Sequence, residues 1–293
     1  MHPPHHPREL VGIGFVVAAV ACFATMDTLV GWISRFVPLL MALWFRYLFQ
    51  AVATTAFFWP RQRARLFATQ QPGLHMLRSL LLLTVSAFAF FSLKYVPVGE
   101  FTAIIMTVPL IITLYASTRL GERVSWRRWA LVLGGFAGVL TIVRPGHEAF
   151  TWAWLLPLGC VVTYTAFQLL TARMTRSEAP ATLHVYTGWV GTLACTLMLP
   201  WVWTAIPDWQ HWVWMAAIGA LGTLGHFALI LAYARAPAAT LTPYLYVQIG
   251  FAMLGGWVAT GHVPDAPAFA GMALIGLCGA LAAWLAVHEK RRI

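Results

Sequence analysis

The sequence predicts an all-α integral membrane protein, with ten transmembrane helices arranged as two inverted-topology repeats of five helices each. Three observations lead to this fold class: ten long apolar stretches, a one-sided distribution of positive charge, and a weak repeat along the chain. Of the 293 residues, 60% are hydrophobic and only 10% are charged, which is far from the composition of an average soluble domain. The connections between the apolar stretches are too short to hold a soluble catalytic domain.

Each apolar stretch is close to the roughly 20 residues that an α-helix needs to cross the hydrocarbon layer of a bilayer. Because lipid offers the backbone no hydrogen-bond partner, these stretches must be helical. The first stretch lacks a strongly basic leader and is too long for a signal-peptide core, so it is interpreted as a span. The predicted spans are residues 11–33, 38–59, 74–95, 98–118, 127–143, 152–172, 182–203, 210–233, 237–259 and 267–287.

The net charge of +10 indicates the orientation of the helices and not a nucleic-acid partner. With the N-terminal tail placed in the cytoplasm, fifteen of the 19 Lys and Arg residues fall on the cytoplasmic side of the predicted spans. This bias is the positive-inside rule, and an even number of spans returns the C-terminal tail to the same side. We therefore expect a multi-pass protein of the lipid bilayer with both termini in the cytoplasm.

The two halves of the chain resemble each other at a nearly constant offset. Pro97 and Pro237, which precede the fourth and ninth spans, are 140 residues apart, and so are Gly121 and Gly261 after those spans. Agreement of the offset over a whole span favours an internal repeat. Because five spans is an odd number, the second copy enters the membrane from the opposite side. Many alternating-access transporters are built on such inverted repeats.

The residues at these repeated positions also resemble those of a known family, the EamA-type proteins. These are the ten-helix members of the drug/metabolite transporter superfamily. The residues that carry the resemblance are Arg46 in the second span, Leu93–Pro97 before the fourth, Pro109 within it, Gly121 and Glu122 after it, and Gly134, Gly135 and Gly138 in the fifth. The second half departs from the pattern, because His262 stands where the repeat would carry a second acidic residue.

The resemblance implies a first repeat over residues 11–145 and a second over 150–288, between cytoplasmic tails at 1–10 and 289–293. It implies a carrier of small organic metabolites in a bacterial-type inner membrane, with a cavity lined mainly by spans one, three, four, six, eight and nine. An aromatic-rich wall with few charges suits an amphipathic metabolite such as an amino acid or a nucleoside- or vitamin-like compound. Two alternatives stay open: an exporter of apolar drug- or lipid-like compounds, and a non-transporting membrane assembly subunit.

Two charged residues inside spans are the first candidates for a substrate site, because a charge in the bilayer costs at least a few kcal/mol. Asp27 lies in the outer half of the first span, and Arg46 lies near the middle of the second, at a similar depth. One interpretation is a buried ion pair that orients the two helices. The other is that one or both side chains face a cavity and bind a charged group of the substrate, with Asp27 also able to carry a coupling proton.

Polar side chains in the second half are the next candidates. His226 in the eighth span is either a hydrogen-bonded core residue or a cavity residue that titrates near neutral pH. Tyr244 and Gln248 in the ninth span are four residues apart and therefore share one helix face. Tyr164 and Gln168 repeat this spacing in the sixth span. We expect both pairs to line the substrate cavity.

Prolines interrupt two corresponding spans. Pro109 lies within the fourth span and Pro243 within the ninth, where each removes a backbone donor and can break its helix. Such interruptions are the best sequence pointer to a transporter binding site, although a purely structural kink is the alternative. At the outer end of the fourth span we expect Glu100 to pair with Lys94 at a solvated rim.

No motif of an enzyme or of a cofactor site is present in the sequence. It contains no phosphate-binding glycine loop after a strand, no His-Glu-x-x-His and no paired intramembrane aspartates. Without a nucleotide-binding motif, transport has to run on a gradient. The four cysteines lie inside predicted spans without the spacing of a metal site, so we expect them to be reduced and to bind no metal.

Overall fold

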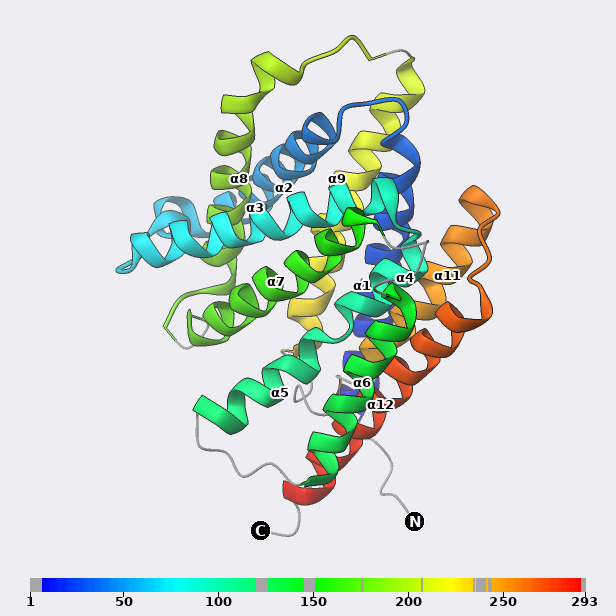
Figure 1. Ribbon diagram of the computed structural model, residues 1–293. Coiled ribbons are helices and arrows are strands. Elements are labelled where there is room, and N and C mark those ends of the chain that lie inside the picture. The colour runs from blue at the N-terminus through cyan, green and yellow to red at the C-terminus, as the bar shows by residue number, and fades with distance from the viewer. Residues whose placement is uncertain are drawn as a thin grey trace.

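The computed structural model describes residues 7–119, 126–144, 151–174, 177–206, 208–233, 235, 241 and 244–290, and this part of the chain contains helices and no strand (Figure 1). Helices of the first half are α1 (Pro7–Ile33), α2 (Leu39–Gln62), α3 (Pro72–Tyr95), α4 (Val98–Ile105), α5 (Val108–Arg119) and α6 (Trp126–Val143). Those of the second half are α7 (Leu155–Met174), α8 (Pro180–Val202), α9 (Trp209–Tyr233), α11 (Val247–Thr260) and α12 (Ala266–Lys290). Two short 3₁₀ segments are η1 (Arg63–Phe67) and η2 (Trp152–Trp154).

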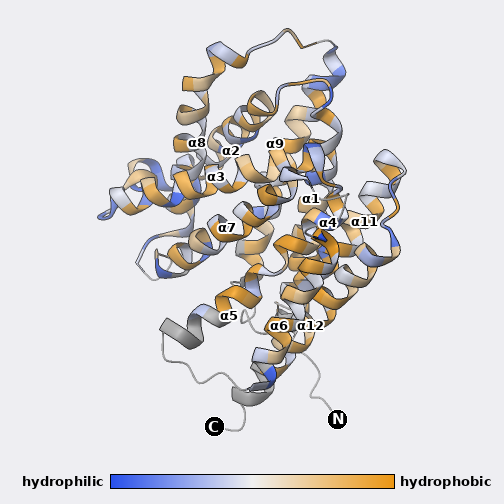
Figure 2. Cartoon of the chain, viewed as in Figure 1, coloured by the Kyte–Doolittle hydropathy of each residue, from blue (hydrophilic) through white to orange (hydrophobic). Residues whose placement is uncertain are grey.

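Several of these helices are suited to a bilayer. By length and composition, six can cross a membrane: Leu10–Ile33, Leu39–Phe67, Pro72–Tyr95, Trp152–Thr171, Pro180–Val202 and Trp209–Leu229. Four more apolar helices are shorter, namely Val98–Ile112, Trp129–Val143, Val247–Thr260 and Ala266–Ala282. Figure 2 shows hydrophobic residues along most of the helices, and large apolar side chains are exposed on the outside, with Trp201 at 79% and Val258 at 73%. These features fit a multi-pass membrane protein, because lipid, unlike water, favours an apolar exterior.

The predicted fourth span is interrupted. Helix α4 ends at Ile105, Met106 and Thr107 form a turn, and α5 begins at Val108. Pro109 explains the position, because a proline cannot donate to the carbonyl four residues earlier and its ring clashes with that carbonyl, here that of Ile105. A second turn, at Tyr246, precedes α11. It lies 140 residues after Met106, while Pro243 lies outside the described residues.

The helices pair across the two halves of the chain. Helix α1 packs on α9, α2 on α8, α3 on α7 and α6 on α12. Glycines bring these pairs together: a Cβ atom at Gly138 of α6 would lie 2.9 Å from the carbonyl oxygen of Gly271 in α12. A Cβ atom at Gly188 of α8 would lie 2.8 Å from the backbone of Ala51 in α2. Close backbone approach at small residues is typical of membrane helix pairs.

Two charged residues lie differently from the sequence-based expectation. The expected pair of Glu100 with Lys94 is wrong: Glu100 is buried, and its Oε1 lies 2.9 Å from Nε2 of His262. Arg78, one of the fifteen Lys and Arg residues assigned to the cytoplasmic side, lies within α3 and is only 8% exposed. Its contacts are described below.

Candidate functional site

A cavity of about 110 Å³ lies where seven helices meet, and it gathers five of the eight predicted site residues. Asp27 of α1, Arg46 of α2, Tyr164 of α7, His226 of α9 and Gln248 of α11 all line it. The rest of the wall is mainly apolar and aromatic. It consists of Phe23, Met26, Leu82, Val85, Ser86, Ala89, Phe90, Phe101, Thr102, Ile105, Met106 and Cys160.

Arg46 is the central cation of this cavity and is only 3% exposed. Its Nη1 donates to Oγ of Ser86 at 3.1 Å, and its Nη2 lies 3.5 Å from Nε2 of His226. A neutral His226 with its proton on Nδ1 can accept this bond. The Nε–H of Arg46 has no hydrogen-bond partner among the described residues. A buried guanidinium with a free donor is costly, so it is suited to receive an acceptor from a ligand.

The space beside this donor depends on a glycine. A Cβ atom at Gly222 of α9 would lie 3.3 Å from Nε of Arg46 and 3.1 Å from Sδ of Met26. Both distances are tighter than ordinary van der Waals contact. A side chain at Gly222 would therefore crowd the free Nε–H of Arg46.

Asp27 is the acidic group of the cavity and is 6% exposed. Although Asp27 and Arg46 line the same space, no ion pair within 4.0 Å joins these two described residues. Of the two interpretations above, this structure therefore does not contain the buried ion pair. The carboxylate of Asp27 instead borders two cavities, the central one and a larger one that opens at the end of α1.

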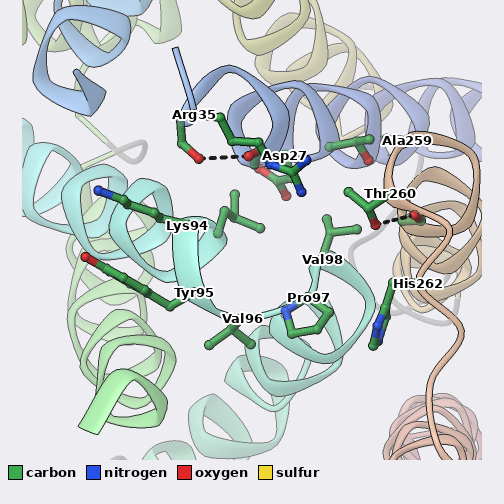
Figure 3. A pocket seen from close by; sticks show the side chains of 15 residues that line it. Asp27, Arg35, Lys94, Tyr95, Val96, Pro97, Val98, Ala259, Thr260 and His262 are labelled. Carbon is green, nitrogen blue, oxygen red and sulfur yellow. Dashed lines mark hydrogen bonds between the residues drawn. The ribbon is translucent and has the colours of Figure 1, made fainter. Parts of the chain in front are cut away.

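This larger cavity, here called the vestibule, has a volume of about 450 Å³. It is formed by the last turns of α1, the connection between α3 and α4, and the end of α11. Figure 3 shows Lys94 and Tyr95 on one side of it and Thr260 and His262 on the other. The lining residues are Asp27, Thr28, Gly31, Ser34, Arg35, Leu93, Lys94, Tyr95, Val96, Pro97, Val98, Gly256, Ala259, Thr260 and His262.

At the opposite end of α3, polar contacts join the two halves of the chain. Arg78 donates from Nε to Oγ1 of Thr171 at 2.9 Å, and from Nη1 to Oγ1 of Thr187 at 2.7 Å and to the carbonyl of Leu183 at 3.1 Å. The side-chain amide of Gln50 donates to the carbonyl of His184 at 3.2 Å. These bonds tie α2 and α3 to α7 and α8 on the side of the central cavity away from the vestibule.

A largely buried polar cluster at the connection between α7 and α8 continues these contacts. Oγ1 of Thr69 donates to Oε1 of Glu178 at 2.8 Å, and Nε2 of His75 lies 3.3 Å from Oε2 of Glu178. Burial would raise the pKa of the Glu178 carboxyl, but the hydrogen bond from Thr69 and the proximity of His75 lower it overall. The carboxylate thus stays ionised and holds the start of α3 to this connection.

Three predicted site residues line neither cavity. Gln168 lies one turn after Tyr164 on α7, Pro109 lies in the first turn of α5, and Tyr244 packs on a small apolar cluster with Leu241 and Ala232. Other cavity residues were not among the predicted ones, including Ser86, Thr102 and the phenylalanines. Two of them had a usable signal, because Ser86 precedes His226, and Thr102 precedes Thr242, by 140 residues, the offset of the repeat. No group of three His, Cys, Asp or Glu side chains in the described ranges could hold a metal ion.

Comparison with known proteins places these features in a family. The EamA-like transporter family matches residues 10–144. A protein named riboflavin transporter from Vibrio cholerae is 32% identical over 231 residues, which cover 76% of each chain. Another riboflavin transporter, from Rhizobium johnstonii, is 30% identical over 92% of this chain and 89% of its own length. A crystal structure with 18% identity superposes with a TM-score of 0.64, covering 95% of this chain and 97% of the other, so the fold extends over both halves.

Proposed function

We propose that this chain, which belongs to the EamA-like transporter family and transports a small metabolite, carries riboflavin or a closely related flavin. The observation that carries the proposal is the central cavity, where Arg46, Asp27 and Gln248 lie among aromatic side chains. A flavin ring is planar, so it can stack on phenylalanine and tyrosine rings. Its pyrimidine edge carries an imide N–H between two carbonyl groups. Such an edge needs both an acceptor, as Asp27 provides, and donors, as Arg46 and Gln248 provide.

The proposed mechanism is gradient-driven alternating access between a first repeat at residues 11–145 and a second at 150–288, with ten spans in total. Helix pairing supports it: if α7 is the counterpart of α1 and α9 that of α3, the α1–α9 and α3–α7 contacts are equivalent. The α2–α8 and α6–α12 pairs then each join one helix to its own counterpart. The turns at Met106 and Tyr246 follow the same 140-residue offset. A midplane site between two inverted halves is the usual arrangement in such carriers.

Proton coupling through Asp27 is part of this proposal. The side chain of Asp27 borders both the central cavity and the vestibule. It can therefore receive a proton from one side and contact the substrate on the other. We place the protein in a bacterial-type inner membrane with both termini in the cytoplasm. Reporter fusions after residue 293 and within residues 145–150 should then give opposite sidedness, and equal sidedness would contradict the ten-span topology.

The direct test of function is flavin uptake by purified protein in proteoliposomes. We expect saturable riboflavin uptake that increases when a proton gradient is imposed. Gln248→Leu keeps the bulk of the side chain and removes both amide functions, so affinity should fall by about 1–3 kcal/mol. Val258→Leu, on an exposed apolar face of the same helix, is the matched control and should leave uptake unchanged. Absence of uptake and of competition by any flavin would refute the proposal.

A further inference from the structure

We infer that the substrate site has two compartments: the central cavity takes the hydrogen-bonding edge of a planar heterocycle, and the vestibule takes a hydrophilic tail that is neutral or anionic. This inference rests on the proposed function and extends it, because it assigns the two parts of the ligand to different residues. Asp27 is the residue at which the two compartments meet.

The volumes of the two cavities support a division of the ligand between them. Pockets that hold a complete small molecule have volumes of roughly 300–1,000 Å³. At about 110 Å³ the central cavity is too small for a whole metabolite, whereas the vestibule, at about 450 Å³, lies within this range. A ligand that reaches the central cavity with one end of a ring therefore has to keep its remainder outside that cavity, and the vestibule, which shares Asp27 with it, has the volume to hold this remainder.

The central cavity offers unused hydrogen-bonding groups of both kinds. Nε of Arg46 and Oγ1 of Thr102 are buried and lack a partner in the described part of the chain. Asp27 supplies an acceptor, and the amide of Gln248, in a residue only 8% exposed, supplies a donor and an acceptor. A lactam or imide edge alternates acceptors and donors within the width of one ring. It can therefore satisfy several of these groups at once, and an apolar ligand cannot.

The vestibule wall presents a different pattern. The hydroxyl groups of Thr28, Ser34 and Thr260 already donate to carbonyl oxygens of their own helices, at 2.7–2.8 Å. Their remaining capacity is to accept, so they favour a ligand that carries many donors. Arg35 and Lys94 add donors to the same wall. A polyol chain, in which every hydroxyl both donates and accepts, matches this combination.

The charged residues of the two compartments determine which charge the tail of the ligand can carry. The fixed cations along the combined lining are Arg35, Lys94 and Arg46, and they face a single carboxylate, that of Asp27. His262 also lines the vestibule, where it is held 2.9 Å from the buried Glu100. An anionic tail next to Arg35 and Lys94 is therefore favoured, and a cationic one is repelled. Removing both cations should selectively weaken binding of an anionic ligand.

The test is competition against riboflavin binding by three flavins that differ only in the tail. Lumiflavin has the ring and no polyol, riboflavin has the neutral polyol, and flavin mononucleotide carries a terminal phosphate. In the double variant Arg35→Gln/Lys94→Gln we expect flavin mononucleotide to lose roughly 2- to 5-fold in affinity per charge removed, as exposed ion pairs do. Lumiflavin should change by less than this. Gln248→Leu should instead weaken all three flavins by a similar factor.

A matched control separates this local effect from the net charge. The double variant Arg61→Gln/Arg65→Gln also removes two exposed cations, but at the end of α2 and in η1, away from the vestibule. It should leave the ratio of the affinities for flavin mononucleotide and riboflavin unchanged.

The possible outcomes distinguish the two proposals. If no flavin binds to the wild-type protein, the proposed function fails. If riboflavin binds but flavin mononucleotide does not compete, or if the vestibule variant weakens the three flavins equally, the two-compartment inference is overturned while flavin transport stands. A loss of flavin mononucleotide affinity that disappears at high salt supports the inference, because surface charges are screened there.

Discussion

Replacing Arg46 with glutamine should separate substrate binding from stability. The guanidinium makes one charge-assisted hydrogen bond, to Ser86 at 3.1 Å, and a longer contact, to His226 at 3.5 Å. Glutamine can still donate to Ser86, and the variant no longer buries a charge whose desolvation opposes folding. We therefore expect the free energy of unfolding to change by less than about 1 kcal/mol.

Substrate affinity should respond much more strongly to the same change. A hydrogen bond to a charged group contributes about 1.5–3 kcal/mol, and every 1.4 kcal/mol corresponds to roughly tenfold in affinity. If the free Nε–H of Arg46 binds an acceptor of the substrate, Arg46→Gln should weaken binding by roughly 10- to 150-fold. Flavin fluorescence titration of the purified protein measures the affinity, and thermal unfolding in the same detergent measures the stability.

Two results would refute this reasoning about Arg46. Affinity within twofold of wild type in a folded variant would mean that the substrate does not contact the guanidinium. A large loss of stability with little loss of affinity would mean that Arg46 acts as a structural residue. Ser86→Ala is the matched comparison, because it removes the acceptor of Arg46 and leaves the charge in place. It should destabilise the protein by about 1–3 kcal/mol, since two buried groups, Nη1 of Arg46 and the hydroxyl of Tyr47, lose their hydrogen-bond partner.

Three further predictions concern other parts of the molecule. Gly222→Ala places a methyl group 3.3 Å from Nε of Arg46, so it should reduce flavin affinity severalfold in binding titrations while the protein still folds. Arg78→Gln removes bonds that join α3 to α7 and α8, so thermal unfolding should show a loss of about 2–4 kcal/mol. The pKa of Asp265 is lowered by its hydrogen bonds to the backbone of Ala268 and to Arg144. Its stabilising effect is therefore present above the ordinary carboxyl pKa and lost as the pH falls through the lowered value. Asp265→Asn should reduce stability at pH 7, by less than about 1 kcal/mol at this exposed site, and the difference from wild type should shrink as the pH is lowered into the acidic range.

Helix positions could be predicted because hydropathy and length are properties of the sequence alone. The interruption near Pro109 was also predictable, but its position was not obvious, since a proline acts on the carbonyl four residues earlier, that of Ile105. The side chains that line the cavity were harder to predict from the sequence. Asp27 and Gln248 stand out in an apolar span because they are polar, whereas Thr102 and Phe101 do not. In a helix that is apolar on all sides, the sequence does not reveal which face meets a cavity.

The same limit explains why the four-residue spacing from Tyr164 did not place Gln168 at the cavity. Tyr164 and Gln168 share a helix face, but four residues advance a helix by about 6 Å along its axis, and the small cavity ends before the second side chain. Residue type was also uninformative at Arg78, because its positive charge assigned it to the cytoplasmic side and did not indicate that the side chain is buried. The structure buries this arginine between α3, α7 and α8 because backbone and threonine oxygens there accept its hydrogen bonds.

The position of Arg46 relative to the repeat explains how a single cation can contact both halves of the protein. Its two contacts, Ser86 on α3 and His226 on α9, are 140 residues apart, the same offset that relates Pro97 to Pro237. Arg46 therefore lies between positions that are equivalent under the proposed repeat. If the halves rock against each other, Arg46 can keep one contact while the other loosens, so its charge would remain in the central cavity throughout. Under the proposed movement Asp27 on α1, which borders both the central cavity and the vestibule, would change its surroundings, and this is the property that a coupling group needs.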